Sequence, residues 1–410
     1  MNSKFRERLL IDNIIPKKIN DISKKYRALL IDDIDNNIIE TETISTCPCG
    51  SLNLEELSKI DRFGLPFGSL ICQDCGLIST SPRITNKSLP YYYNNYYHPL
   101  NFGIESLETR NALYSDGQGV KIFNKLKPFL PKTNKLEILE IGAGTGSVLV
   151  EFKEEAKKHK IEVSELGTEY SDECIKECQN RNINIIEGNI QTVLATNKQF
   201  DIIILSHVFE HFVDLKKELT DLGKLMHSQS LLYIEVPGIL VNHKKWYYDF
   251  SYLIYHVHAH MYNFTRNTLS NLLSMSNFKE LDANEEVEAI YQLSDSNNKT
   301  NNARSYSETL KYLKFLDENN TYFIQESTDK RFYERQYHQQ QQTIYNRENT
   351  IQGKESLIEK QKDQIEKQNI IINKIKKSKT KVIQTKALFH PIEKYKTYKN
   401  LLKVINESKN

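Results

Sequence analysis

Three features are missing from this sequence of 410 residues. No run of about 18 apolar residues occurs, so no segment is long enough to form a membrane-spanning helix. The opening MNSKFRERLL is charged and contains no apolar core of a secretion signal. The 55 Lys and Arg nearly balance the 53 Asp and Glu, so no global positive charge marks a nucleic-acid-binding protein. We therefore expect a cytoplasmic protein, whose six cysteines are thiols or metal ligands rather than disulfides.

Composition divides the chain into successive segments. Between about 105 and 294, short apolar runs such as LEILEIGAGTG, FDIIILSHV and SLLYIEVPG alternate with amphipathic stretches. This alternation predicts an α/β domain with a parallel sheet covered by helices on both faces. The expected segments are a helical segment at 1–44, a cysteine- and tyrosine-rich module at 45–104, the α/β domain at 105–294, a polar linker with short helices at 295–342, and a long helix with a basic tail at 343–410.

The last segment has a seven-residue period. Isoleucine recurs at Ile344, Ile351, Ile358, Ile365 and Ile372, but the positions that would pair with this stripe are mostly polar. A coiled coil that joins copies of the chain and a solvated single helix therefore both fit. The lysine-rich tail beyond it fits either a solvated face or peripheral contact with an anionic membrane or an acidic partner.

A glycine loop joins the first apolar run of the α/β domain to an amphipathic segment. Its spacing, Gly142-Ala-Gly144-Thr-Gly146, lacks the third glycine of the dinucleotide fingerprint, because Ser147 stands there. The next expected strand ends at Glu169, whose carboxylate can accept hydrogen bonds from both hydroxyls of a ribose. The third ends before Asn189 and Ile190, where a polar group can meet an adenine. With no phosphate-binding Lys in the loop, these features predict a nucleoside without phosphates, such as S-adenosylmethionine.

The segments EIGAGTG, GTEYS, FDIIILSHVFEHFVDL and LLYIEVPG, in this order, resemble the class I S-adenosylmethionine-dependent methyltransferases. The resemblance implies a Rossmann-like sheet of seven strands. It also implies that the three glycines surround the methionine part of the cofactor and that Glu169 holds the ribose. The remaining candidates for contact with the cofactor adjoin these motifs and are Glu140, Tyr170 and His207.

Two cysteine pairs precede this domain. Cys47-Pro-Cys49 and Cys72-Gln-Asp-Cys75 are about 20 residues apart, and a glycine follows each pair. Four thiolates can surround a zinc ion tetrahedrally, and with no position left open such a site is structural. We therefore expect structural zinc here.

A tyrosine-rich stretch, YYYNNYYH, follows the cysteines. Flat rings with hydroxyls suit stacking on a sugar, although a packing patch between two domains fits equally well. The cysteine pairs and tyrosines ahead of a methyltransferase domain resemble the zinc-containing sugar methyltransferases of bacterial deoxysugar and surface-polysaccharide pathways. That resemblance implies that the tyrosines border the acceptor pocket. The candidate substrate-binding residues are Tyr92, Tyr93, Tyr96, Tyr97 and Tyr262.

Three of the 11 histidines alternate in the stretch YHVHAHMYNF. On a strand, alternate residues share one face, so the stretch fits a metal site, a catalytic base with neighbours, or chance. In the sugar methyltransferases the last histidine of a similar stretch is taken as the general base, which implies this role for His260, with His258 as a partner. The glutamate of that pattern is Ala259 here, which leaves O-methylation at least as well supported as C-methylation. Glu210 and His211, after the fourth expected strand, either shape the pocket or take part in catalysis.

The leading hypothesis is a methyltransferase that acts on a sugar, nucleotide-sugar or surface-glycan acceptor. One alternative is an RNA methyltransferase with a zinc module, against which the near-zero net charge argues. Another is a scaffold that binds the cofactor without turnover.

Overall fold

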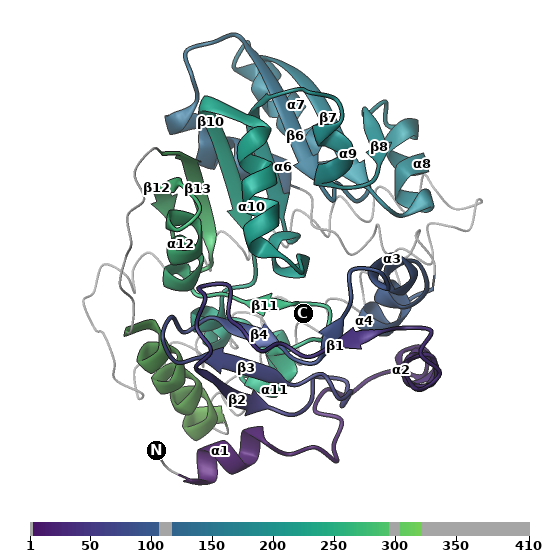
Figure 1. Ribbon diagram of the computed structural model, residues 1–410. Helices are drawn as coiled ribbons and strands as arrows, with labels where there is room; N and C mark the ends of the chain where they lie inside the picture. Colours follow the sequence, from purple (N-terminus) through teal and green to yellow (C-terminus); the bar gives the residue numbers. More distant parts are fainter. Residues whose placement is uncertain (1–2, 106–116, 295–303, 321–410) are drawn as a thin grey trace, which may run out of the picture. The chain divides into compact units, whose positions relative to one another are not determined.

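The computed structural model describes residues 3–105, 117–294 and 304–320 (Figure 1). All of them belong to one compact unit, Met1–Ser327. Among these residues, none of the helices combines the length and the apolar character needed to cross a bilayer. The isoleucine stripe and the basic tail lie outside the described residues, so the expected oligomer and membrane contacts stay predictions.

The central sheet has seven strands in the order β12-β13-β10-β9-β6-β7-β8. Strands β8, β7, β6, β9 and β10 are parallel, whereas β13 is antiparallel to both of its neighbours. The predicted α/β domain with a seven-stranded sheet is confirmed. The strands are β6 (Lys135–Ile141), β7 (Glu162–Glu169), β8 (Ile185–Glu187), β9 (Phe200–Ser206), β10 (Met226–Glu235), β12 (Phe278–Ala283) and β13 (Glu288–Leu293).

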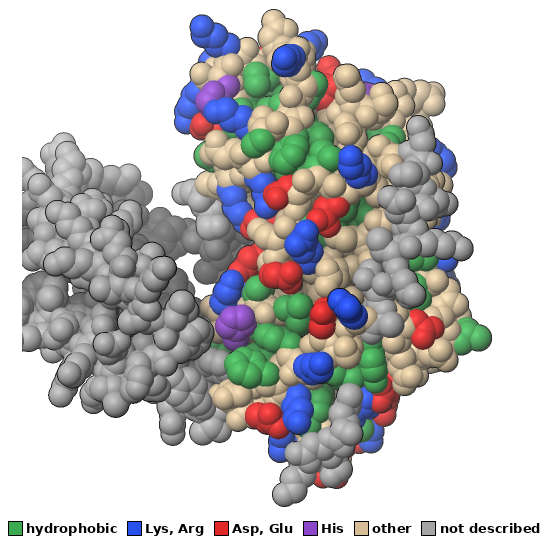
Figure 2. Space-filling model, turned by 90° about the vertical axis from the view of Figure 1, so that its left-hand side faces the viewer, with side chains coloured by type: hydrophobic (Ala, Val, Ile, Leu, Met, Phe, Trp, Pro, Cys, Tyr) green, Lys and Arg blue, Asp and Glu red, His purple; other side chains and the backbone are tan. Residues whose placement is uncertain are grey.

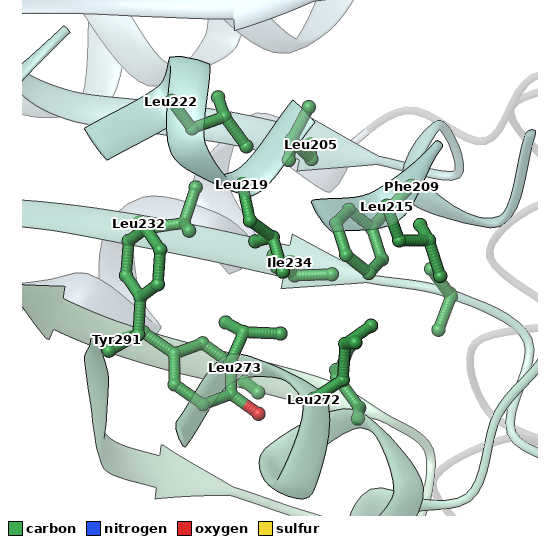
Figure 3. Packing of buried hydrophobic residues seen from close by; sticks show 14 of the residues in the cluster. Leu205, Phe209, Leu215, Leu219, Leu222, Leu232, Ile234, Leu272, Leu273 and Tyr291 are labelled. Atoms are coloured by element: carbon green, nitrogen blue, oxygen red, sulfur yellow. The ribbon is translucent and has the colours of Figure 1, made fainter. Parts of the chain in front are cut away.

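Helices cover both faces of this sheet because its strands are apolar at successive positions. On β9, Ile203 and Leu205 face one core, and Ile202 and Ile204 face the other. The first core is completed by α9 (Ile190–Leu194), α10 (Leu215–Lys224) and α12 (Arg266–Ser274), and the second by α6 (Gln118–Leu126), α7 (Ser147–Lys158) and α8 (Asp172–Asn180). Figure 3 shows the first core, in which leucines of α10 and α12 meet side chains of β10 and Tyr291 of β13.

A second sheet carries the cysteine module. Its order is β11-β4-β3-β2, with β2 (Leu54–Ser58), β3 (Ser69–Cys72), β4 (Ile78–Thr80) and β11 (Tyr262–Asn263). The edge strand β11 belongs to the stretch that follows β10, so the chain returns from the central sheet to this one. A further pair joins β1 (Thr41–Glu42) to β5 (Arg83–Ile84). The pairing of β11 with β4 ties the histidine stretch to the cysteine module.

Short helices surround the second sheet. They are α1 (Ser3–Leu9), α2 (Asp21–Asp35), α3 (Leu89–Tyr92), η1 (Tyr93–Tyr97), α4 (His98–Phe102) and α11 (Tyr252–Tyr255), and short turns η2 (Lys127–Phe129), η3 (Phe209–His211), η4 (Ile239–Lys244) and η5 (Trp246–Tyr248) occur elsewhere. Residues 304–320 are also helical, and Leu310, Leu313 and Leu316 pack in one cluster with Phe5 of α1 and Ile71 of β3. The polar segment at 295–342 therefore includes a helix that packs on the N-terminal module.

Figure 2 shows one face of the molecule, on which Lys and Arg are interspersed with Asp and Glu. No large area of a single sign occurs among the described residues on this face. This distribution agrees with the nearly balanced charge of the sequence.

Candidate active site

The glycine loop follows β6 at the carboxyl end of the parallel strands, where α/β proteins bind ligands. Gly142, Gly144 and Gly146 all have positive φ, at 69°, 54° and 74°. A Cβ on Gly142 would come within 2.7 Å of Val208, whereas a Cβ on Gly144 would meet nothing within 4 Å. The backbone at Gly144 therefore borders open space that a side chain would fill, as a cofactor-binding loop requires.

Glu169, the last residue of β7, is held by the backbone around it. One carboxylate oxygen accepts from the amide of Gly144 at 2.9 Å. The other accepts from the amides of Tyr170 at 2.7 Å and Ser171 at 3.0 Å. These bonds fix the carboxylate beside the glycine loop, and its remaining lone pairs can accept hydroxyl groups.

Glu140, at the end of β6, is buried, and its Oε2 has no hydrogen-bond partner among the described residues. Burial raises the pKa of this carboxyl well above its usual value, and the nearby charge of Glu169 raises it further. A buried carboxyl without a partner is costly unless a ligand supplies one. Together with the open space at Gly144, Glu140 fits a ligand that carries a positive group.

The other predicted cofactor contacts lie at neighbouring strand ends. Tyr170 is exposed after β7, and Asn189 caps α9 by accepting from the amide of Gln191 at 2.9 Å. His207 follows β9, and its side chain is 55% exposed. Ile190 differs from the expectation, because its side chain is fully buried in the core, so only its backbone is available to a ligand.

The histidine stretch is not a strand, and its three imidazoles do not share a face. It runs from the end of α11 at Tyr255 through a turn, with the amide of His260 donating to the carbonyl of Val257 at 3.0 Å, and only then reaches β11. His256 and His258 are fully buried. The shared face on which a metal site of these three histidines depends is therefore absent.

His258 belongs to a closed polar group, which we call the Asp61 triad (Asp61, His258 and Tyr92). Nδ1 of His258 donates to Asp61 at 2.6 Å, and the hydroxyl of Tyr92 lies 2.7 Å from Nε2. Asp61 also accepts from the amides of Phe63 and Leu65. All three side chains are fully buried and form hydrogen bonds with one another or with the backbone, and the catalytic role of His258 stays a prediction.

His260 belongs to a second, largely buried group, which we call the Glu210 cluster (Glu210, His211 and His260). Oε1 of Glu210 lies 3.9 Å from Nε2 of His211 and 3.9 Å from Nε2 of His260. The two imidazole rings meet edge to face, with their centroids 5.0 Å apart. Burial lowers the pKa of both histidines, that of His260 well below its usual value, with His211 and Arg62 contributing at His260. Both imidazoles are therefore neutral near pH 7 and offer a lone pair.

The tyrosines of the stretch YYYNNYYH lie in helices, and those four residues apart share a face. Tyr92 and Tyr96 face a core, whereas Tyr93 and Tyr97 are only partly buried and face His211, with ring centroids 6.0 and 5.8 Å away. Tyr262 is buried, and its hydroxyl donates to the carbonyl of Val213. Packing buries the side chains of Tyr92, Tyr96 and Tyr262, and their expected substrate contacts stay predictions. Tyr93 and Tyr97 remain candidates.

The four cysteines of the two pairs come together. Their Sγ atoms all lie within 4.8 Å of one another, with Cys47 to Cys75 at 3.6 Å and Cys49 to Cys72 at 3.7 Å. Four thiolates around a zinc ion lie about 3.8 Å apart, given Zn–S bonds of about 2.3 Å. The donor set and its spacing fit zinc. Cys174 and Cys178 lie on α8 and are not part of this group.

Two buried carboxylates near the candidate site were not anticipated from the sequence. Asp61 is 197 residues from its partner His258, and nothing in the segment KIDRFG marks it. Glu235, at the end of β10, accepts from the hydroxyl of Tyr233 at 2.9 Å and from Lys121 of α6 at 3.0 Å. Its position at a strand end, after LLYI, is the only signal that could have indicated it.

Comparison with known proteins identifies the α/β domain. Residues 116–283 match the family model described as a methyltransferase domain. This match bears out the methyltransferase domain expected in this part of the chain.

Individual relatives are distant. A probable polyketide synthase 10 of Dictyostelium discoideum is 24% identical over 224 residues, which are 44% of this chain and 9% of that protein. Among solved structures, the CurJ carbon methyltransferase is 18% identical, with a TM-score of 0.38, over 48% of this chain and 61% of its own. A methyltransferase from Clostridium acetobutylicum is 12% identical, with a TM-score of 0.34, over 51% of this chain and 98% of its own. This chain thus matches less than a tenth of its curated relative.

Proposed function

We propose that this chain transfers a methyl group from S-adenosylmethionine to a sugar, nucleotide-sugar or surface-glycan acceptor. The observation that carries the proposal is the arrangement around the Glu210 cluster. Two imidazoles and the rings of Tyr93 and Tyr97 gather around η3, which follows β9 directly after Val208, the residue that borders Gly142 of the glycine loop. Aromatic faces with hydroxyls suit a polar, ring-shaped acceptor, and a neutral imidazole suits removal of its proton.

We assign a role in cofactor binding to the glycine loop and to the two carboxylates beside it. Gly142, Gly144 and Gly146 let the cofactor approach the backbone, Glu169 accepts hydrogen bonds from its ribose, and the unpartnered Glu140 receives its positive amino group. When bound, S-adenosylmethionine supplies a methyl group on a positively charged sulfur. Transfer breaks the carbon–sulfur bond and forms a bond from the methyl carbon to the acceptor, leaving a neutral thioether.

His260 is the residue that we assign as general base in the protein without a metal ion at the cluster. Its Nε2 takes the proton of the acceptor as the new bond forms, and Glu210, 3.9 Å away, stabilises the imidazolium that results. Tyr93 and Tyr97 position the acceptor. His211 shapes the pocket by donating from Nδ1 to the carbonyl of Ala259 at 2.8 Å.

Incubation with labelled S-adenosylmethionine, separately with a panel of nucleotide-sugars and with total RNA, tests this function. We expect label in a nucleotide-sugar, with a loss of about 100-fold or more in the His260→Ala variant. The matched control is His227→Ala, which removes an imidazole from the opposite end of the sheet and retains full activity. Labelled RNA and unlabelled sugars would contradict the acceptor class, and full activity of His260→Ala would exclude the proposed base.

We also propose that Cys47, Cys49, Cys72 and Cys75 hold a structural zinc ion that stabilises the second sheet. The proposal is supported by the spacing of the four Sγ atoms. We expect about one zinc per chain by elemental analysis and its loss in Cys72→Ser, whereas Cys174→Ser retains it. Zinc-free wild-type protein that melts at the same temperature would contradict a stabilising ion.

A further inference from the structure

We propose that the Glu210 cluster binds a divalent transition-metal ion, which holds an oxygen of the acceptor. The inference rests on the proposed function and deepens it, because it limits the acceptor to molecules whose reacting group or its neighbour is an oxygen that can ligate a metal. It concerns a site separate from the four cysteines.

The spacing of the cluster suits an ion better than hydrogen bonds. Its three ligand atoms, one each from Glu210, His211 and His260, lie within 4.8 Å of one another. The separations of 3.9 Å from the carboxylate to each Nε2 are too long for hydrogen bonds. Nitrogen and oxygen ligands around a tetrahedral ion lie about 3.4 Å apart, so a small rotation of the side chains closes the site.

Glu210 itself indicates a missing partner. The carboxylate is 1% exposed, and neither oxygen has a hydrogen-bond partner among the described residues. The nearest nitrogens are those of the two cluster imidazoles and Nδ1 of His207, at 3.7 Å. A buried carboxylate that lacks hydrogen bonds costs several kcal/mol, about the scale that a bound cation offsets.

The backbone prepares His211 to act as a ligand. Nδ1 of His211 lies 2.8 Å from the carbonyl oxygen of Ala259, to which it donates its proton. Nε2, which faces Glu210, therefore carries the lone pair. Metal-binding histidines commonly donate their other ring nitrogen to a backbone carbonyl in this way.

The donor set selects the class of ion. Two imidazoles and one carboxylate favour zinc, iron, cobalt or manganese over magnesium and calcium, which prefer oxygen alone. Three protein ligands leave coordination positions open for an acceptor oxygen. In the ion-bound protein His260 is a ligand, and the ion takes over activation of the acceptor by lowering the pKa of the bound hydroxyl, whose proton passes to solvent.

Titration with Co²⁺ tests the inference, because its visible spectrum distinguishes nitrogen and oxygen ligands from thiolates. The full chain is first loaded with one equivalent of zinc, which four thiolates bind in preference to the cluster, and Co²⁺ is then added at neutral pH. We expect one further ion per chain, without thiolate charge-transfer bands, and binding at least about 10-fold weaker in Glu210→Gln and in His260→Gln. The matched control is Asp201→Asn, which alters a carboxylate 3.1 Å from His227 outside the cluster and keeps wild-type binding.

Wild-type protein that takes up Co²⁺ only at its cysteines would overturn the inference, as would unchanged binding in Glu210→Gln with native circular dichroism. Methyl transfer measured on the same samples separates this result from the proposed function. Transfer that persists at full rate after chelation of the second ion overturns the metal site and leaves the methyltransferase intact. Ion binding without transfer to any nucleotide-sugar supports the site and contradicts the proposed acceptor.

Discussion

The Asp61 triad and the Glu210 cluster each combine a buried carboxylate with histidine from the same short stretch of chain. In the triad, both nitrogens of His258 and both oxygens of Asp61 have hydrogen-bond partners. In the cluster, Glu210 has none among the described residues. The comparison shows that burial does not distinguish structural from functional polar groups, whereas satisfaction of their hydrogen bonds does. The polar groups of the triad satisfy one another within the fold, whereas the cluster holds the carboxylate for which we propose a ligand.

We expect the Asp61 triad and the Glu210 cluster to differ most in how much a substitution lowers the free energy of unfolding. Asp61→Ala leaves His258 and two backbone amides without their acceptor in a fully buried site, and we expect it to lower the free energy of unfolding by about 3–5 kcal/mol. Glu210→Gln removes the charge of a buried carboxylate that lacks hydrogen bonds, so we expect no loss of stability. Urea denaturation followed by circular dichroism measures both. Equal losses would show that Glu210 is as fully satisfied as Asp61.

Lowering the pH should lower the free energy of unfolding through His256, the first histidine of the stretch. This side chain is fully buried beside the carbonyl oxygen of Phe67, and burial lowers its pKa from 6.5 to about 4. The unfolded chain therefore takes up a proton at higher pH than the folded one, and stability present above pH 6.5 is lost as the pH falls toward 4. The expected loss is about 3 kcal/mol.

Urea denaturation across this pH range, on wild type and on His256→Gln, measures the contribution of His256. The variant should lack this part of the pH dependence. Parallel pH profiles for the two proteins would show that His256 does not titrate differently on folding.

For catalytic activity we expect the reverse of the effects on stability, so that the larger loss comes from the Glu210 cluster. Glu210→Gln is expected to lower kcat by about 100-fold, because the cluster loses the charge that stabilises either an imidazolium or an ion. The melting temperature should stay near that of wild type. Steady-state kinetics with the acceptor that the nucleotide-sugar panel identifies measures the change in kcat. An unchanged kcat would make the cluster a structural feature like the triad.

The smallest effects distinguish two adjacent tyrosines. Tyr92→Phe removes the hydroxyl 2.7 Å from His258 and should cost about 1 kcal/mol of stability, with KM for the acceptor unchanged. Tyr93→Phe removes a hydroxyl that faces His211 at 3.0 Å and should raise that KM several-fold, with little change in stability. Thermal melts measure the stability of both variants, and acceptor titrations measure their KM. A raised KM in Tyr92→Phe together with a loss of stability in Tyr93→Phe would contradict our assignment of the two tyrosines.

Local signals sufficed to predict the sheet, the glycine loop and Glu169. Each depends on residues that are close in sequence, such as an apolar strand followed by glycines or an acid at a strand end. The tyrosines could also have been separated, because Tyr92 and Tyr96 are one helical turn apart and share the buried face. The alternating spacing of the histidines did not indicate their surroundings, because each imidazole meets a partner from a different, distant segment. The partner of His258 is 197 residues away, and no local period encodes such a pairing.

Calorimetric titration of the full chain with S-adenosylmethionine tests the central claim most directly. We expect one site per chain, with binding weaker by about 100-fold in Glu169→Ala because the hydrogen bonds that the ribose hydroxyls donate to this carboxylate are lost. Glu162→Ala, at the exposed opposite end of β7, should bind as wild type does. Absence of binding to the wild-type chain, or equal affinity in Glu169→Ala, would contradict the account.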